Sequence, residues 1–199
     1  MKITKLEYQK DDPNRVNVYV DGQFAVGIGV DDVLKMQLFK DKEVTQKEVN
    51  KIVAESEFGM LYNFALNFLS FRPRSEWEVR FHLGKKTKDQ GLIDKVIEKL
   101  VTIKQIDDES FSKWFLDQRN AFRPKGKMVL ELELRKKGIS TEIIKNALTG
   151  DTASEFEKAW YLVSKKKLSD REKIIRFLGT RGFSWDTIND VLAKLKHKD

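Results

Sequence analysis

The chain has 199 residues, of which 40% are hydrophobic and 35% are charged, and its formal net charge is +7. This length is enough to bury real cores, but the charged fraction and the negative mean hydropathy predict several small modules rather than one compact enzyme domain. The absence of Cys excludes disulfides, thiolate catalysis and Cys-based zinc sites. No apolar run approaches the roughly 20 residues of a membrane span, and the start of the chain lacks the apolar segment of a signal peptide, so we expect a cytoplasmic protein.

The first part of the chain, residues 1–44, is predicted to be a β-rich extension with a short helix. Ile3–Tyr8 and Val16–Val20 alternate apolar and polar residues with a period of two. Asp21-Gly22 then precedes Gln23–Ile28, which is a strong hairpin signal. These segments predict a small three-stranded antiparallel sheet.

Two helices are expected next. Asp31 and Asp32 place carboxylates where a helix N-terminus favours them, so a short helix should run from there to about Leu38. Thr45 and Glu48 then match a capping box, which predicts the start of a long helix that extends to about Leu69.

From residue 45 onward one helical pattern occurs three times: an apolar helix, a basic turn, a second helix ending in Lys or Arg, and a short third helix. The copies align at Leu83…Gly91…Ile97, Leu134…Gly138…Ile144 and Leu178…Gly182…Ile188. A fixed period of this size predicts a mainly α fold of tandem three-helix repeats in an elongated, curved array, without a single deep pocket. The predicted repeats are residues 45–103, 104–149 and 150–199.

Helix-capping residues recur at matching places in these repeats. Ser75–Glu78 and Ser169–Glu172 resemble capping boxes and predict the starts of two second helices. Gly138 and Gly182 follow basic helix ends, where a glycine in the left-handed conformation is expected.

Aromatic residues also recur at helical spacing. Phe111, Trp114, Phe115 and Phe122 are predicted to share one helix face, and Phe71 corresponds to Phe122 in the first repeat. Such a stripe predicts a core, although exposed aromatic rings are also platforms for single-stranded bases. Among the Trp residues, Trp114, Trp160 and Trp185 are expected in cores, and Trp77 is expected to be partly exposed.

The positive charge is concentrated in the repeats. Residues 1–62 carry 9 Lys and Arg against 11 Asp and Glu, whereas residues 63–199 carry 29 against 20. This asymmetry predicts that the repeats bind nucleic acid or an acidic partner. Arg72-Pro73-Arg74 and Arg123-Pro124-Lys125 recur 51 residues apart, and two interpretations stay open: these cations contact a partner, or Pro starts a helix and the cations stabilise helix ends.

Catalytic chemistry has little support in the sequence. Neither His82 nor His197 has a spaced Cys or carboxylate partner that would complete a metal site or a nucleophile triad. The acidic run Asp107-Asp108-Glu109 is explained by helix capping rather than by metal binding. We therefore expect a protein that is not an enzyme and needs no cofactor.

In combination, four blocks resemble the RecX family of recombination regulators: Arg72–Glu76, Ile106–Phe111, Glu133–Ile139 and Arg176–Phe183. The resemblance covers nearly the whole chain. It implies tandem three-helix repeats that bind the RecA recombinase, chiefly as the filament on single-stranded DNA, along its helical groove. It also implies that this binding modulates, mostly by inhibition, RecA's ATPase, strand exchange and co-protease activities, in DNA repair, recombination and the SOS response.

The residues predicted to contact the filament are the cations of the repeats and their turns: Arg72, Arg74, Arg119, Arg123, Lys125, Arg135, Lys136, Lys137, Arg176 and Arg181. The alternative is a helical-repeat protein that binds DNA directly, without a protein partner. The sequence does not decide whether RecA or DNA provides most contacts, whether the effect is inhibition or stimulation, or what the N-terminal sheet binds. A monomer is favoured because the repeats stack on one another, but the oligomeric state and the flexibility between repeats stay open.

Overall fold

The computed structural model describes residues 1–151 and 154–196, so His197 lies outside the described residues. The chain forms two compact units. The N-terminal unit comprises Met1–Ser70 and His82–Lys99, and the C-terminal unit comprises Phe71–Phe81 and Leu100–Asp199. Among the described residues, no helix is long and apolar enough to cross a membrane.

The N-terminal unit begins with the expected antiparallel sheet of β1 (Ile3–Tyr8), β2 (Arg15–Val20) and β3 (Gln23–Gly29), in the order β1-β2-β3. Asp21 and Gly22 form the turn between β2 and β3, with φ angles of 48° and 82°. A two-residue turn with both φ angles positive matches the right-handed twist of the strands, which is why the Asp-Gly pair predicted this hairpin correctly.

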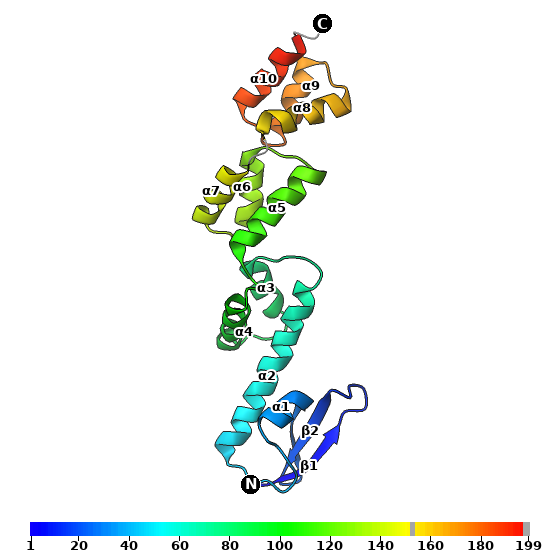
Figure 1. The fold of residues 1–199 in the computed structure, drawn as a ribbon, viewed down its shortest axis with the longest axis vertical. Helices are drawn as coiled ribbons and strands as arrows, with labels where there is room; N and C mark the ends of the chain where they lie inside the picture. Colours follow the sequence, from blue (N-terminus) through cyan, green and yellow to red (C-terminus); the bar gives the residue numbers. More distant parts are fainter. Residues whose placement is uncertain (152–153, 197–199) are drawn as a thin grey trace. The chain divides into compact units, whose positions relative to one another are not determined.

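Two helices complete the sheet's core. Helix α1 (Val30–Lys35) ends three residues before the expected Leu38, and α2 (Gln46–Leu69) has the predicted bounds. The capping box of α2 is confirmed, because the Thr45 side chain accepts from the Glu48 N–H and the Glu48 side chain accepts from the Thr45 N–H. Helix α2 lies along β3 (Figure 1) and buries Val49 and Ile52 in the same apolar cluster as the sheet residues.

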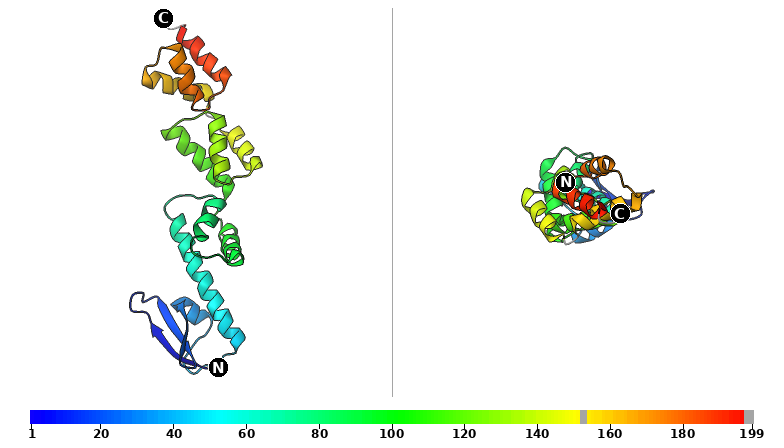
Figure 2. Two further views of the ribbon diagram at one scale, coloured as in Figure 1. Left: turned by 180° about the vertical axis from the view of Figure 1, so that it is seen from behind. Right: turned by 90° about the horizontal axis from the view of Figure 1, so that it is seen from above.

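Eight more helices follow among the described residues: α3 (Glu76–Leu83), α4 (Gln90–Thr102), α5 (Asp108–Phe122), α6 (Lys127–Lys136), α7 (Thr141–Gly150), α8 (Glu155–Lys166), α9 (Arg171–Gly179) and α10 (Trp185–Lys196). Helices α5–α7 form one three-helix bundle and α8–α10 form another (Figure 2). The expected fold class, tandem three-helix repeats behind a small antiparallel sheet, is confirmed. The boundaries predicted between the extension and the repeats stay a prediction.

Each bundle of the C-terminal unit has its own apolar core. Phe111, Phe115, Leu130 and Leu134 lie in the core of the α5–α7 bundle. The α8–α10 bundle buries a separate set that includes Val163, Ile174, Leu178, Phe183 and Ile188. Because each core is small, the bundles also need contacts with their neighbours.

The two junctions between successive repeats are built in the same way. At the first, the Glu76 N–H donates to Asp108 Oδ1 at 2.9 Å, and Ser75 Oγ donates to the Lys137 carbonyl at 2.7 Å. Each contact thus joins the start of α3 to a neighbouring helix or turn of the next repeat. Since the first N–H groups of a helix have no partner within it, the next repeat completes the hydrogen bonding of α3.

The second junction repeats this arrangement between α6 and the α8–α10 bundle. The Lys127 N–H donates to Glu155 Oε1 at 2.7 Å, and the Gly126 N–H donates to the Arg181 carbonyl at 2.9 Å. A carboxylate at the start of α8 therefore caps α6, just as Asp108 at the start of α5 caps α3.

Gly138 and Gly182 serve both the helix ends and the junctions. Both have φ of +77°, which confirms the predicted left-handed conformation. A Cβ at Gly138 would lie 2.3 Å from the Trp77 Cβ, and a Cβ at Gly182 would lie 2.5 Å from Val129 Cγ2. The turn before the third helix of each bundle thus packs closely on the second helix of the preceding repeat.

Two capping predictions need correction. Helix α9 is capped by Asp170, whose side chain accepts from the Lys173 N–H, and not by Ser169. At α3, Ser75 accepts from the Glu78 N–H as predicted, but the Glu78 carboxylate binds Arg72 and Lys137. The second half of the predicted box is therefore replaced by an ion-pair cluster.

The aromatic stripe is only partly a core. Phe111 and Phe115 are buried and Trp114 packs against them, but Phe122 is 78% exposed and Phe71 is 82% exposed. The prediction for Trp185 was also wrong, because its side chain is 57% exposed, more than the 48% of Trp77. Phe122 is the last residue of α5, Trp185 is the first residue of α10, and Phe71 lies two residues after the end of α2.

Replacing Gly138 or Gly182 by Ala should destabilise the C-terminal unit. The new Cβ adds left-handed backbone strain and overpacks the junction, which together cost about 2–4 kcal/mol of unfolding free energy. Urea denaturation of each variant measures this cost. Gly179→Ala is the matched control, because a Cβ there meets nothing within 4 Å, and its unfolding free energy should stay within about 1 kcal/mol of wild type.

Candidate partner interface

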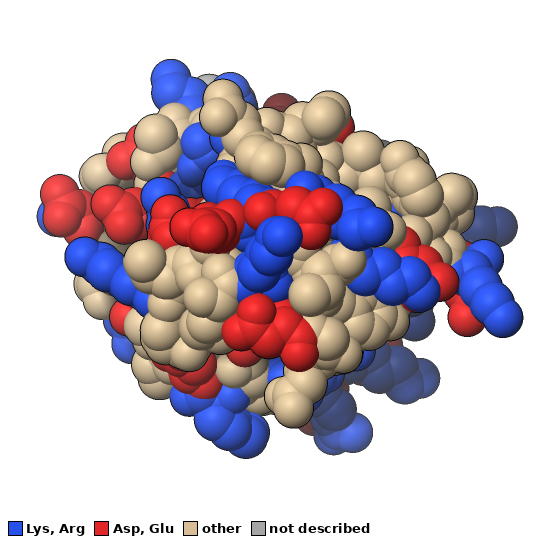
Figure 3. All heavy atoms as spheres, turned by 90° about the horizontal axis from the view of Figure 1, so that it is seen from below, with Lys and Arg blue, Asp and Glu red and all other residues tan. Residues whose placement is uncertain are grey.

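The net positive charge resides in the C-terminal unit. Its residues include 24 Lys and Arg against 17 Asp and Glu, whereas the N-terminal unit has 14 of each. Figure 3, seen from the end where Figure 1 marks the N-terminus, shows basic and acidic side chains interspersed over that face. All ten cations predicted to bind a partner belong to the C-terminal unit.

Two of these cations meet at Glu78, at the first junction. Arg72 binds the carboxylate with both terminal nitrogens, at 2.9 and 3.1 Å, and Lys137 Nζ lies 2.6 Å from Oε1. The Glu78 side chain is only 9% exposed. Burial raises the pKa of Glu78, but the hydrogen bonds and charges of Arg72 and Lys137 outweigh burial and hold this pKa below its usual value.

Two further candidates meet at Glu133, on α6. Arg119 Nε lies 2.7 Å from Oε2, and Lys125 Nζ lies 2.5 Å from Oε1. Burial again raises the pKa of the carboxylate, but the hydrogen bonds and charges of Lys125 and Arg119 together lower this pKa by more. The Arg119 guanidinium also lies 4.8 Å from the centre of the Phe115 ring, so it joins α5, α6 and the core.

Both clusters combine two cations with one carboxylate and so keep one net positive charge. Arg72 and Lys137 come from different repeats, which means that the Glu78 cluster also helps to fix the first junction. These four candidates therefore have a structural role in the fold, whatever they do toward a partner.

The other candidates differ in how far they are engaged. Arg135 pairs with Glu131 one helical turn away, at 2.6 Å and largely exposed. Arg181 lies over the Phe177 ring at 3.8 Å and donates to the Phe177 carbonyl. Arg123, Lys136 and Arg176 are exposed and have no ion-pair partner among the described residues.

Arg74 is half-buried. Burial lowers the pKa of its guanidinium and the neighbouring charge of Arg72 lowers it further, whereas Glu78 acts in the opposite direction. Arg74 thus belongs to the surroundings of the Glu78 cluster rather than to an open surface.

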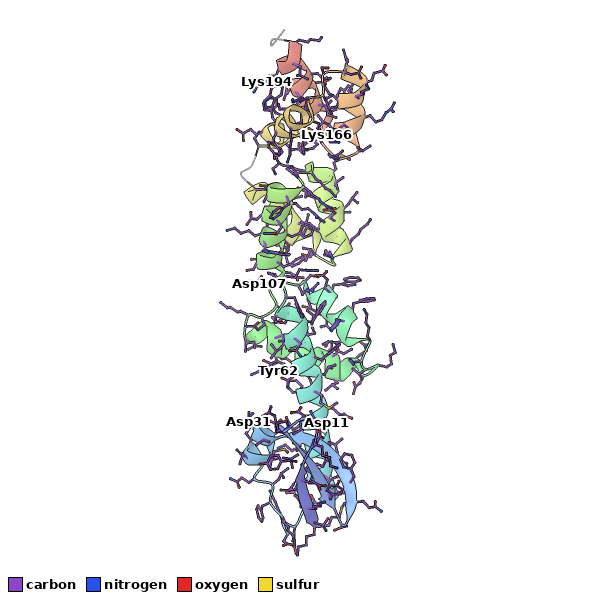
Figure 4. The ribbon with its side chains drawn as sticks, turned by 90° about the vertical axis from the view of Figure 1, so that its right-hand side faces the viewer. Asp11, Asp31, Tyr62, Asp107, Lys166 and Lys194 are labelled. Carbon is purple, nitrogen blue, oxygen red and sulfur yellow. The ribbon has the colours of Figure 1, made fainter. Side chains whose placement is uncertain are left out.

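In the α8–α10 bundle, lysine side chains cover aromatic residues, and two of these lysines are labelled in Figure 4. Lys166 Nζ lies 4.9 Å from the centre of the Phe177 ring, and Lys194 Nζ lies 4.5 Å from that of Trp160. Cations over aromatic faces gain an electrostatic attraction and also limit the access of other groups to those rings. Trp160 is therefore part of the bundle's packing, as the sequence predicted.

The acidic run at the start of α5 acts as a cap. Asp107, labelled in Figure 4, accepts from the Ser110 and Glu109 N–H groups, and these hydrogen bonds, the one from Ser110 above all, hold its pKa below the usual value. Burial raises the pKa of Asp108, which caps α3. In the part of the chain that the structure describes, no group of three His, Cys, Asp or Glu side chains is arranged to hold a metal.

Comparisons with known proteins agree with this architecture. Three family models match: the regulatory protein RecX N-terminal domain over residues 1–45, the first RecX three-helix domain over 62–100 and the second over 107–148. The regulatory protein RecX of Bacillus subtilis is 33% identical over 99% of this chain and 78% of its own length. The regulatory protein RecX of Clostridium perfringens strain 13 is 30% identical over 100% of this chain and 98% of its own length.

The chain belongs to the RecX family. Among solved structures, a crystal structure of regulatory protein RecX has a TM-score of 0.75 at 25% identity and covers 97% of this chain and 98% of its own. The crystal structure of RecX from Lactobacillus salivarius has a TM-score of 0.63 at 29% identity, and the match covers 70% of this chain and 96% of that one. The resemblance inferred from the sequence blocks is thereby confirmed, and the protein is a member of a regulatory family.

Sequence reasoning missed the acceptors that organise the RecX repeats here. The sequence pattern predicts a capping box at Glu78 and shows Glu133 only as part of a family block. It does not indicate that Asp108 and Glu155 cap helices of another repeat. A local pattern does not show such contacts, because Glu76 and Asp108 are 32 residues apart in sequence.

The Glu78 cluster makes a testable prediction about acid stability. Glu78→Gln should destabilise the protein by about 1–3 kcal/mol at pH 7, because Arg72 and Lys137 then lose the buried carboxylate that pairs with both of them. Since the folded-state pKa of Glu78 is lowered, its contribution is present above the ordinary value of 4.5 and is lost as the pH falls through the folded pKa. The difference between wild type and variant in urea denaturation should therefore shrink below about pH 4.5.

The exposed pair Glu131–Arg135 provides the control for this experiment. Glu131→Gln should change the unfolding free energy by less than about 0.5 kcal/mol at pH 7, since exposed ion pairs contribute little. Equal effects of Glu78→Gln and Glu131→Gln at every pH would contradict the role given to the Glu78 cluster.

Proposed function

We propose that this protein regulates RecA, mostly as an inhibitor, by binding the RecA filament on single-stranded DNA along its helical groove. The observation that carries this proposal is membership of a family of regulatory proteins over essentially the whole chain. Binding there would modulate the ATPase, strand exchange and co-protease activities of RecA. The protein acts through binding, without catalytic chemistry of its own.

The charge distribution supports a polyanionic target. The C-terminal unit contains the whole excess of 7 positive charges, and a filament that contains DNA has one phosphate per nucleotide. The binding energies of contacts on successive repeats add up, because each contact that forms raises the effective concentration of the target at the next repeat.

The ten candidates differ in whether they already form ion pairs within the protein. Arg72, Arg119, Lys125 and Lys137 are engaged with Glu78 and Glu133, so their replacement would disturb the fold. Arg123, Lys136 and Arg176 can bind a partner without breaking an ion pair that the structure shows. These three residues are the sharpest test of the proposal.

Reversal of these three charges should relieve inhibition. The triple variant Arg123→Glu, Lys136→Glu and Arg176→Glu should need about tenfold or more protein for half-inhibition of RecA's DNA-dependent ATPase, since like charges then face an acidic surface. Its thermal unfolding should match wild type, because all three side chains are exposed.

The matched control reverses three exposed lysines of the N-terminal unit, Lys10, Lys40 and Lys51, with the same change in net charge. It should inhibit nearly as well as wild type. Equal inhibition by wild type and the folded triple variant would rule out the charged part of this interface.

Direct DNA binding without RecA is the second candidate function, and the excess of cations in the C-terminal unit favours it too. It predicts that the affinity for bare single-stranded DNA falls with salt, with a slope of log affinity against log salt of about −0.7 per phosphate contacted. Fluorescence anisotropy with naked and RecA-coated strands separates the two functions. Equal affinity for both would favour the direct binder, and a marked preference for coated strands would favour the regulator of RecA.

A further inference from the structure

Six large apolar side chains are exposed at matched positions of the first and second repeats. Each residue of the first repeat has its counterpart 51 residues later. The exposed fractions of the pairs are Phe71 82% and Phe122 78%, Trp77 48% and Met128 66%, and Phe81 60% and Leu132 54%. We call Phe71, Trp77 and Phe81 the first apolar triad, and Phe122, Met128 and Leu132 the second apolar triad.

Two members of each triad lie on the second helix of a repeat. Trp77 and Phe81 are one turn apart on α3, and their rings stack with centroids 5.4 Å apart at an interplanar angle of 10°. Met128 and Leu132 have the same spacing on α6 and therefore share a helix face. The third member, Phe71 or Phe122, lies directly before the Arg-Pro turn that precedes the helix.

Packing within the protein does not account for this exposure. The opposite face of α6 already supplies Leu130 and Leu134 to the core, and both are fully buried. Met128 and Leu132 thus form an apolar surface on a helix that has buried its other face, and Phe122 at the end of α5 completes the second triad. Large exposed apolar groups on neighbouring positions are typical of surfaces that bind another molecule.

The third repeat differs at the same positions. The second and third repeats can be aligned at the N-caps of their second helices, Gly126 and Asp170. In this alignment Lys166, Glu172 and Arg176 occupy the positions of Phe122, Met128 and Leu132. The apolar surface therefore occurs twice and is replaced by charged residues in the third repeat, although all three repeats share one fold.

We infer that the two apolar triads dock two successive, identical subunits of a protein filament, each of which presents an apolar element flanked by acidic residues. A surface that is duplicated at one fixed period fits a target that is itself repeated. The acidic flanks follow from charge complementarity, because the second triad is accompanied by the exposed cations Arg123, Lys127 and Lys136.

The composition of the triads favours protein over bases as the occupant. Stacking of single-stranded bases needs an aromatic face at each position. Met128 and Leu132 have no such face, yet they occupy the positions of Trp77 and Phe81 and are also exposed. What the two triads share is apolar area, which suits the apolar core of a protein interface.

This inference rests on the proposed function, since it assigns the RecA filament as the repeated target. Two equivalent contacts on one chain engage two subunits, so the second contact forms at high effective concentration. Loss of one triad should then weaken binding, and loss of both should weaken it far more.

The experiment replaces two exposed residues in each triad: Phe71→Ser with Phe81→Ser, Phe122→Ser with Leu132→Ser, and all four together. Affinity for RecA filaments on single-stranded DNA, measured by anisotropy of the labelled protein, should fall about tenfold for each double variant and about a hundredfold or more for the quadruple variant. Affinity for naked single-stranded DNA should not change. The control, Leu34→Ser with Phe39→Ser, removes similarly exposed apolar side chains of the N-terminal unit and should bind the filament like wild type.

Circular dichroism spectra and melting curves like those of wild type establish that the variants are folded. If the folded quadruple variant binds the filament as tightly as wild type, the inference is overturned. The proposed function is unaffected by that result as long as the wild-type protein inhibits RecA. Weaker binding to naked strands to the same extent as to filaments would assign the triads to bases and overturn it too. A wild-type protein that sediments as a dimer while the quadruple variant is monomeric would assign them to a second copy of this chain. Failure of the wild type to bind RecA filaments at all would overturn both the inference and the proposed function.

Discussion

The C-terminal unit depends on how the unpaired N–H groups at the start of α3 and of α6 are satisfied. In a short helix these groups are a large share of the backbone, and leaving them unpaired at a covered junction would be costly. Asp108 accepts from α3 and Glu155 accepts from α6, each from the start of the next repeat's first helix. The first and second repeats therefore do not complete their hydrogen bonding alone, which couples the folding of each to that of the next repeat.

The same constraint explains why a serine and a glycine occupy equivalent positions. Ser75 uses its hydroxyl both to accept from Glu78 N–H and to donate to the Lys137 carbonyl. At Gly126 a Cβ would lie 1.9 Å from the Gly182 carbonyl oxygen, so no side chain fits. The turn of the next repeat approaches more closely there, and the backbone N–H of Gly126 makes the bond that the Ser75 hydroxyl makes at the first junction.

Local signals were enough to predict most of the fold. The Asp21-Gly22 turn, the Thr45 capping box and the left-handed glycines 138 and 182 each act within a few residues, and each was predicted correctly. The shift from Ser169 to Asp170 shows the limit of such signals, because both residues are good caps and the choice depends on where the bundle places the helix.

The candidate interface was harder to predict because a sequence does not show which cations are engaged. Arg72 and Arg123 occupy equivalent places in the Arg-Pro turns, yet Arg72 binds a carboxylate and Arg123 is exposed. The difference lies in the residue six positions after each arginine, which is Glu78 in the first repeat and Val129 in the second. The first arginine of a motif that looks duplicated in sequence is thus part of an ion-pair cluster in one copy and exposed in the other.

Exposed aromatic residues raised the opposite difficulty. Helical spacing assigned Phe122 to a core together with Phe111 and Phe115, but spacing alone does not show where the covering helices end. Phe122 is the last residue of α5, beyond that cover, and its counterpart Phe71 is equally exposed. The exposure itself repeats with the 51-residue period. This distinguishes Phe71 and Phe122 from isolated apolar residues on the surface, because an isolated residue has no reason to recur at the same place in a second copy.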